Sequence, residues 1–193
     1  HDGEFVPSLV VRNQIIREIR KWNADIVLSP RPNDYHPDHR YTGVLVQDAS
    51  YLVIVPNIAS DINPLTKNPL FLYLNDNFKR PNPFQPDIVV AIDKSIDKKI
   101  NALDAHVSQM YEWIPWTMGE ENTVPKGKTN RKKWLKDRWR GNSKISNEEG
   151  ESLEKWYGGQ SRKDVKYIEV FEVCEYGNRP TDKQILRLFP MLN

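Results

Sequence analysis

The sequence predicts an α/β layered fold with a mainly parallel sheet and helices on both faces. Short apolar runs rich in branched residues, typical of buried strands, occur at 25–29 and 87–92. Each run is followed by a segment whose apolar residues recur at helical spacing. An amphipathic helix over 7–22 leads straight into the first strand, so the two form an αβ unit whose helix needs a sheet to cover.

A change of composition toward proline and asparagine separates the two halves of the predicted sheet. Residues 54–86 contain six prolines that interrupt any long element, which indicates a structured loop region with one strand at 70–74. Its later part, the prolyl loop (residues 75–84), either walls a substrate cleft or covers a sheet edge. The same criteria give the remaining elements, namely helices over 93–113, 148–157 and 182–188 and a strand over 165–173.

Composition limits the broad class of the protein. With 193 residues, 38% of them hydrophobic and 28% charged, the chain suits one globular domain, which we expect to span 1–193. A single cysteine excludes an internal disulfide and a cysteine-rich zinc site. No run approaches the ~18 apolar residues of a membrane span, so we expect no membrane partner. The single cysteine is compatible with a reducing compartment, and we expect a cytoplasmic location.

The motif loop (residues 30–40) holds two histidines and two aspartates between the first strand and the next helix. Pro37 suits the first position of that helix, because its missing N–H needs no partner there, and it places His36 at the N-cap. Open α/β sheets keep ligand sites at the carboxyl ends of their strands. We therefore expect the rings of His36 and His39 to point into one volume, with Asp38 orienting a ring.

The spacing alone leaves a second interpretation open. His36 and His39 can be surface residues of a loop, with the two aspartates as ordinary turn and cap residues. Residue types do not choose between a site and such a loop.

Three motifs resemble those of the zinc-dependent PIG-L/LmbE-like N-deacetylases. Asp-Tyr-His-Pro-Asp-His-Arg-Tyr-Thr at 34–42, after a strand, is similar to the second signature of that family. Residues 98–109 resemble its later Lys-x-x-Ala-x-x-x-His-x-Ser-Gln helix, and 167–171 its late Tyr-x-Glu-x-Phe strand. The resemblance thus runs through most of the chain and implies a Rossmann-like deacetylase domain.

The family's first signature, Ala-His-Pro-Asp-Asp-Glu after the opening strand, has no match in this sequence. In the family it supplies a zinc-binding His, a zinc-binding Asp and the Asp that acts as general base. We therefore expect the C-terminal portion of a deacetylase domain whose N-terminal strands are missing. Such a chain has an incomplete zinc site, is inactive alone and requires a companion N-terminal segment.

The resemblance also implies the reaction and the residues that carry it. The reaction is zinc-dependent removal of an N-acetyl group from a small-molecule substrate, an amino sugar or a related glycoside. By motif match His39 is a zinc ligand, while His36 stabilises the oxyanion or protonates the leaving amine and Asp38 holds the His36 ring. Weaker substrate contacts are implied for three residues, Asp34, Arg40 and His106.

A basic segment at 126–144 leaves other functions open. It carries nine basic residues and one acid, and Trp134 and Trp139 lie within it. This pattern can bind nucleic acid, but it is more typical of a solvated helix that anchors its tryptophans on the core, so we expect no nucleic-acid partner. The other alternative is a non-catalytic module that binds a carbohydrate or a partner. The sequence also leaves room for a homo-oligomer.

Overall fold

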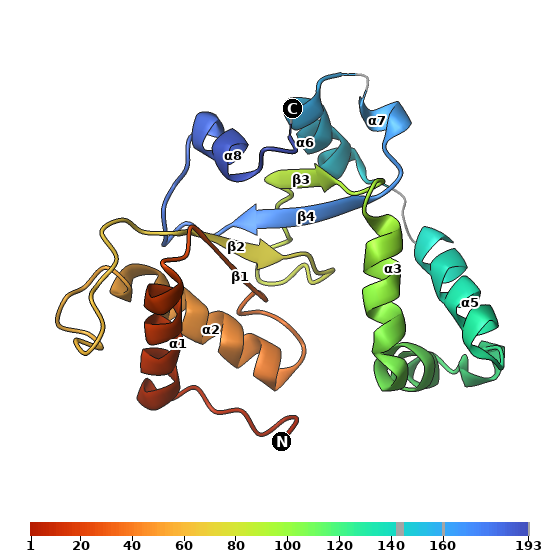
Figure 1. Cartoon of the computed structure of the whole chain (residues 1–193), viewed down its shortest axis with the longest axis horizontal. Coiled ribbons are helices and arrows are strands. Elements are labelled where there is room, and N and C mark those ends of the chain that lie inside the picture. The colour runs from red at the N-terminus through yellow and green to blue at the C-terminus, as the bar shows by residue number, and fades with distance from the viewer. Residues whose placement is uncertain (142–144, 160, 193) are drawn as a thin grey trace.

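The computed structural model describes residues 1–141, 145–159 and 161–192, and these form a sheet with helices packed around it (Figure 1). The sheet has four strands in the order β1-β2-β4-β3. The strands are β1 (Ile26–Ser29), β2 (Leu70–Leu74), β3 (Ile88–Ala91) and β4 (Ile168–Val173). The helices are α1 (Leu9–Trp22), α2 (Pro37–Leu52), α3 (Ile96–Ala105), the π-helical turn η1 (Gln109–Trp113), α4 (Ile114–Thr117), the 3-10 turn η2 (Glu121–Thr123), α5 (Lys128–Gly141), α6 (Asn147–Tyr157), α7 (Ser161–Asp164) and α8 (Asp182–Leu188).

The prediction of a mainly parallel sheet is only partly confirmed. β1 and β2 are parallel, but β4 lies between β2 and β3 and runs antiparallel to both. The chain leaves the sheet at the end of β3 and enters β4 at the same end, where the Ile92 N–H donates to the Tyr167 carbonyl at 2.8 Å. A strand that begins where its neighbour ends must run in the opposite direction.

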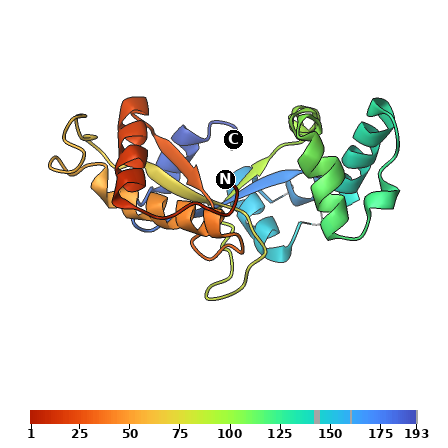
Figure 2. The same ribbon diagram turned by 90° about the horizontal axis from the view of Figure 1, so that it is seen from below.

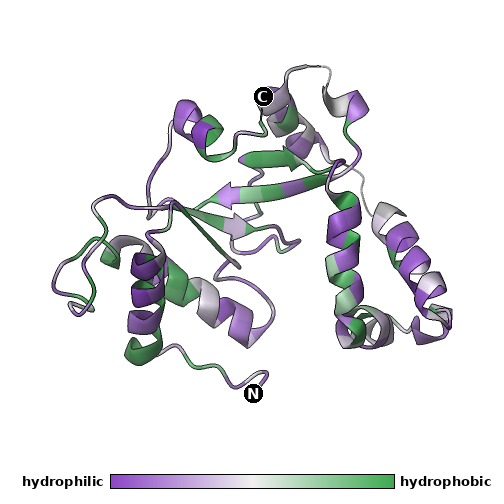
Figure 3. Ribbon diagram, viewed as in Figure 1, coloured by the Kyte–Doolittle hydropathy of each residue, from purple (hydrophilic) through white to green (hydrophobic). Residues whose placement is uncertain are grey.

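Helices cover both faces of the sheet, as expected. In β2, Phe71 and Tyr73 pack with α1 and α2, whereas Leu70 and Leu72 pack with α6 and α8. Successive side chains of a strand point to opposite faces, so β2 contributes side chains to the hydrophobic core on each face of the sheet. Figure 3 shows the hydrophobic residues concentrated on the strands and the hydrophilic ones along α5.

A buried arginine holds α1 to the loop after α2. Arg20 is 4% exposed, and its guanidinium donates six hydrogen bonds to backbone carbonyls. Four of these carbonyls also accept from a backbone N–H, whereas among the described residues those of Ile58 and Ile62 have this guanidinium as their donor. The six acceptors are the carbonyls of Leu52, Val53, Val55, Ile58, Ala59 and Ile62.

The predicted helix over 93–113 is interrupted. α3 ends at Ala105, His106 leaves helical geometry with φ −86° and ψ 66°, and a π-helical turn follows at Gln109–Trp113. In this arrangement the Tyr111 hydroxyl donates to the buried Asp104 carboxylate at 2.7 Å, and burial raises the pKa of Tyr111 to about 12. Apolar spacing continues through the break, which is why the sequence indicates one helix.

The basic segment forms α5, which lies beside α3 at the end of the molecule opposite α1 and α2 (Figures 1 and 2). Leu135 anchors α5 in the core, and its cations contact acids and aromatic rings of the same protein. These contacts agree with a solvated, anchored helix. Lys144, which belongs to the predicted basic segment, lies outside the described residues.

Within the described ranges, no helix has both the length and the apolar character needed to cross a bilayer.

Candidate active site

The motif loop leaves the carboxyl end of β1 and begins α2 as the sequence predicts. Pro37 occupies the first helical turn and His36 is the N-cap residue, whose Nδ1 accepts a hydrogen bond from the Asp38 N–H at 3.3 Å. Gly43 allows α2 to approach this loop, because a Cβ there would lie 2.7 Å from the Pro30 oxygen and 2.9 Å from the Arg31 carbonyl carbon.

We expect Gly43→Ala to lower the free energy of unfolding by about 1–3 kcal/mol, because both contacted atoms belong to the backbone and cannot rotate away. Urea unfolding tests this. Gly159→Ala is the matched control, since a Cβ at that position meets nothing within 4 Å. Equal destabilisation by the two substitutions would contradict the packing argument.

The two motif histidines lie together, as expected. Their ring centroids are 4.8 Å apart, and the Tyr35 ring lies 5.8 Å from each of them. The His36 side chain is 23% exposed and the His39 side chain 49% exposed, so both rings remain accessible at the surface of the loop.

The Nδ1 atoms of the two rings have opposite hydrogen-bonding roles, an acceptor in His36 and a donor in His39. His36 Nδ1 faces a backbone N–H and can only accept, so the proton of its neutral ring lies on Nε2. His39 Nδ1 lies 3.1 Å from Asp34 Oδ1, and an ionised carboxylate only accepts, so this Nδ1 carries the proton. His39 Nε2 therefore presents a lone pair. A ring held by a carboxylate in this way is typical of a metal-ligating histidine.

Asp34, rather than Asp38, orients a histidine ring. The Asp38 carboxylate accepts from the Gly3 N–H at 2.8 Å and the Phe5 N–H at 3.1 Å, and the first of these bonds holds its pKa below the usual range. Within the described residues, Asp38 is hydrogen-bonded to His36 only through its backbone N–H, in contrast to the predicted carboxylate contact. The reason is local: in the first turn of α2 the Asp38 side chain faces the N-terminal segment.

Of the other residues expected to contact substrate, Arg40 lies in the motif loop and His106 lies at the end of α3. Arg40 donates to the carbonyls of Asp34 at 3.1 Å and Tyr35 at 2.7 Å, so it stabilises the motif loop. His106 is an exposed residue at the end of α3. Among the described residues, it takes no part in the contacts that hold the motif loop together.

One group of side chains near the motif loop could hold a metal ion. Ligand atoms of Asp2, His36 and Asp38 lie within 4.8 Å of one another. Asp2 is 92% exposed, and the His36 atom nearest its carboxylate is Nε2, which bears the proton of the neutral ring. This group therefore fits zinc poorly, whereas His39, among the motif-loop residues, fits the role of a ligand. Catalytic zinc sites take three protein ligands, and the described residues supply no such set around His39.

Arg31 joins the motif loop to the prolyl loop, which sequence reasoning missed. Its side chain is 3% exposed and binds both carboxylate oxygens of Asp76, at 2.5 and 2.7 Å. It also donates to the carbonyls of Phe78 and Asn82 at 2.7 and 3.1 Å. Only the position of Arg31 between two prolines beside the motif distinguishes it in the sequence.

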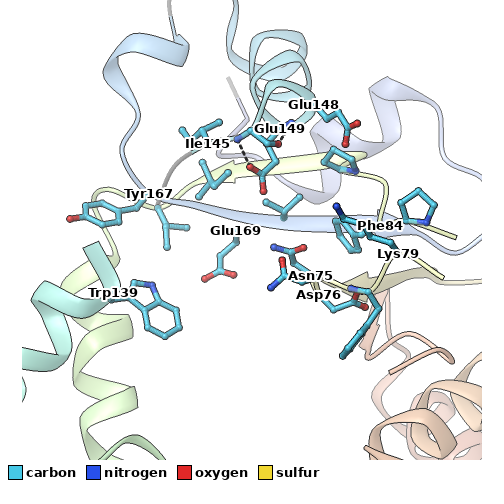
Figure 4. A pocket seen from close by; sticks show the side chains of 18 of the residues that line it. Asn75, Asp76, Lys79, Phe84, Trp139, Ile145, Glu148, Glu149, Tyr167 and Glu169 are labelled. Carbon is cyan, nitrogen blue, oxygen red and sulfur yellow. Dashed lines mark hydrogen bonds between the residues drawn. The ribbon is translucent and has the colours of Figure 1, made fainter. Parts of the chain in front are cut away.

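A cavity of about 690 Å³ lies on the other side of the prolyl loop (Figure 4). Its walls come from this loop, β4, α3, α5 and the start of α6, and neither motif histidine lines it. Lys99 forms an ion pair with Glu169, and its ammonium lies 4.7 Å from the centre of the Trp139 ring. The prolyl loop thus lines a cleft, which is one of the two alternatives that the sequence left open, and this cleft is separate from the motif histidines.

No protein-family model matches the chain. Among solved structures it is similar to N,N'-diacetylchitobiose deacetylase from Pyrococcus horikoshii complexed with its inhibitor MPG, with a TM-score of 0.59 and 22% identity over 91% of this chain and 55% of that one. It is also similar to the conserved protein TT1542 from Thermus thermophilus, with a TM-score of 0.51 and 20% identity over 92% of this chain and 64% of that one. The chain has the fold of these proteins.

At these identities the likeness concerns the fold alone. It is consistent with the family resemblance of the three sequence motifs. The chain spans 55% and 64% of the lengths of the two proteins.

Proposed function

We propose that this chain carries the histidine part of the active site of a metal-dependent N-deacetylase, which acts on an amino sugar or a related glycoside. The observation that carries the proposal is the opposite anchoring of the two adjacent rings, with a proton on His36 Nε2 and a lone pair on His39 Nε2. A deacetylase needs both a metal ligand and a proton donor at the scissile amide. The similarity in fold to a deacetylase structure supports the same function.

The two rings would divide the chemistry between them. Zinc, when bound, would polarise an amide carbonyl and lower the pKa of the attacking water toward neutrality. His39 would be one ligand through Nε2, because Asp34 holds its other nitrogen. His36 would donate a hydrogen bond through Nε2–H to the developing oxyanion, and it would protonate the leaving amine only from its imidazolium form. The remaining ligands and the general base would come from a companion segment, either covalent or separate.

Substitution of each histidine in the intact enzyme separates the role of metal ligand from that of proton donor. His39→Ala should weaken zinc binding by more than about 100-fold, since even the loss of a residue that only orients a ligand costs about 10–100-fold. His36→Ala should keep zinc and lower turnover by about 100–10,000-fold, as expected for loss of a proton donor. Zinc titration and acetate release measure the two effects. Both variants keeping zinc and full activity would contradict the assignment.

Asp34→Asn tests the hydrogen bond that orients the His39 ring. The amide oxygen can still accept from the His36 N–H, so the turn is preserved, but an amide is a weaker partner for the His39 ring. Zinc affinity should fall by about 10–100-fold with the fold intact. Tyr35→Phe, which keeps the aromatic ring beside both histidines, should leave the affinity unchanged.

A further prediction follows from the number of ligands. Residues 1–193 alone should bind zinc weakly and release no acetate, and addition of the companion segment should restore both. Calorimetric titration with zinc, paired with an acetate-release assay, tests this. Tight stoichiometric zinc with turnover by the isolated chain would show that other residues do the chemistry. A complete protein without tightly bound zinc would instead indicate the non-catalytic module.

A further inference from the structure

We infer that the cavity behind the prolyl loop is a saccharide-binding subsite, which takes uncharged sugar rings of an oligosaccharide. Its role as part of a substrate site rests on the proposed function, whereas its binding chemistry does not. The volume of about 690 Å³ falls within the range of about 300–1,000 Å³ that is typical of small-molecule sites.

The charges of the lining disfavour an anionic ligand. Four carboxylates and two lysines line the cavity. Lys99 is paired with Glu169, and Asp76 with the buried Arg31 behind the wall. Of the two lysines, Lys99 is neutralised in this way, and the two remaining carboxylates, Glu148 and Glu149, outnumber Lys79 and disfavour phosphate or sulfate. A neutral, hydroxyl-rich ligand meets no such repulsion.

The uncharged groups of the lining suit a sugar ring. Figure 4 shows the Trp139 indole directed toward the space in front of Glu169, with the Asn75 side chain facing that space from the prolyl loop. A flat indole packs against the apolar C–H face of a pyranose. Amides and carboxylates both accept hydrogen bonds, and amides also donate them. Asn75, Asn77 and Glu148 can therefore form hydrogen bonds with the hydroxyl groups of a sugar.

The prolyl loop connects this cavity to the motif loop. On one side it lines the cavity, and on the other Phe78 lies 6.0 Å from Tyr35 while Asp76 binds Arg31. Because the histidines do not line the cavity, its occupant is not the reacting acetamide. The cavity would instead hold sugar units of the substrate beyond the one that reacts.

The experiment titrates the ¹⁵N-labelled chain, 1–193, with tri-N-acetylchitotriose, cellotriose, the deacetylated glucosamine trimer and inorganic phosphate, and follows the tryptophan indole N–H signals by NMR. We expect saturable binding of at least one neutral trisaccharide with a shift of the Trp139 signal, and no such shift with phosphate. Trp139→Ala should weaken binding at least about tenfold, and Asn75→Ala, at an exposed position, should weaken it with the fold undisturbed.

Trp116→Ala is the matched control, because Trp116 is 61% exposed, stacks on Trp113 and does not line the cavity. Its affinity for the trisaccharide should be unchanged. Absence of saturable binding by the neutral trisaccharides, undiminished binding by both Trp139→Ala and Asn75→Ala, or Trp139-dependent binding of phosphate or of the glucosamine trimer alone would overturn the inference. The titration needs neither zinc nor turnover, so its outcome is independent of the zinc experiments on His39.

Discussion

We expect Arg20→Met to lower the free energy of unfolding by about 3–5 kcal/mol, because each buried carbonyl that loses its only donor costs about 1–3 kcal/mol. Six carbonyls accept from this guanidinium. Four of them also accept from a backbone N–H, which limits the loss to the carbonyls of Ile58 and Ile62. Methionine preserves the apolar stem of the side chain, so the change reports mainly on the hydrogen bonds. Urea unfolding measures it.

Arg17→Met is the control for this prediction. Arg17 lies one turn earlier on α1 and pairs with Asp61, but the two side chains are 33% and 57% exposed. Exposed ion pairs contribute about 0–1 kcal/mol, so this variant should unfold close to the parent. A similar loss in both variants would mean that removal of charge from α1, and not the buried network, sets the effect.

The second large effect is expected for Arg31→Met, again about 3–5 kcal/mol, because it leaves the carboxylate of Asp76 buried without its cation. Asp76 is 11% exposed, and Glu172, 3.5 Å from Arg31, is 18% exposed. Removal of Arg31 also removes the buried hydrogen bonds between the motif loop and the prolyl loop. Arg31→Lys should lose less, since it keeps the charge but not the paired hydrogen bonds.

The loss in Arg31→Met should depend on pH. Burial already raises the pKa of Glu172, and Arg31 opposes that rise. A raised carboxyl pKa in the folded state stabilises the protein at low pH, and this contribution is lost as pH rises through the folded-state pKa. The deficit should therefore be larger at pH 7 than near the ordinary glutamate pKa of about 4.3. A deficit that grows on acidification would contradict the proposed coupling.

Local structure was predictable where a residue has one suitable position. Pro37 has no N–H to donate and so fits the first turn of α2, which fixed His36 as the cap. Thr181 caps α8 through its side chain for a similar local reason. Both histidine rings follow from these positions, and so their proximity could be expected.

Longer-range features could not be read from the pattern. The apolar run that forms β4 would look the same in a parallel or an antiparallel strand. Its periodicity indicates burial but not the end at which the chain enters the sheet. Asp34 and Asp38 are equally plausible partners for a ring until the backbone geometry of the turn is known. The contacts of Arg31, Lys99 and Trp139 join segments far apart in the chain, for which one sequence carries no signal.

The position of β4 has a consequence for the order in which the sheet can assemble during synthesis. β2 and β3 leave the ribosome early, yet neither pairs with the other, because the strand between them is the last of the four to be made. Closing the sheet must wait for residues 168–173, which then pair with both β2 and β3. Contacts this distant in sequence are slow to form. A nascent chain that stops before Ile168 therefore exposes two strand edges, which makes the unfinished protein a target for chaperones or for association with other chains.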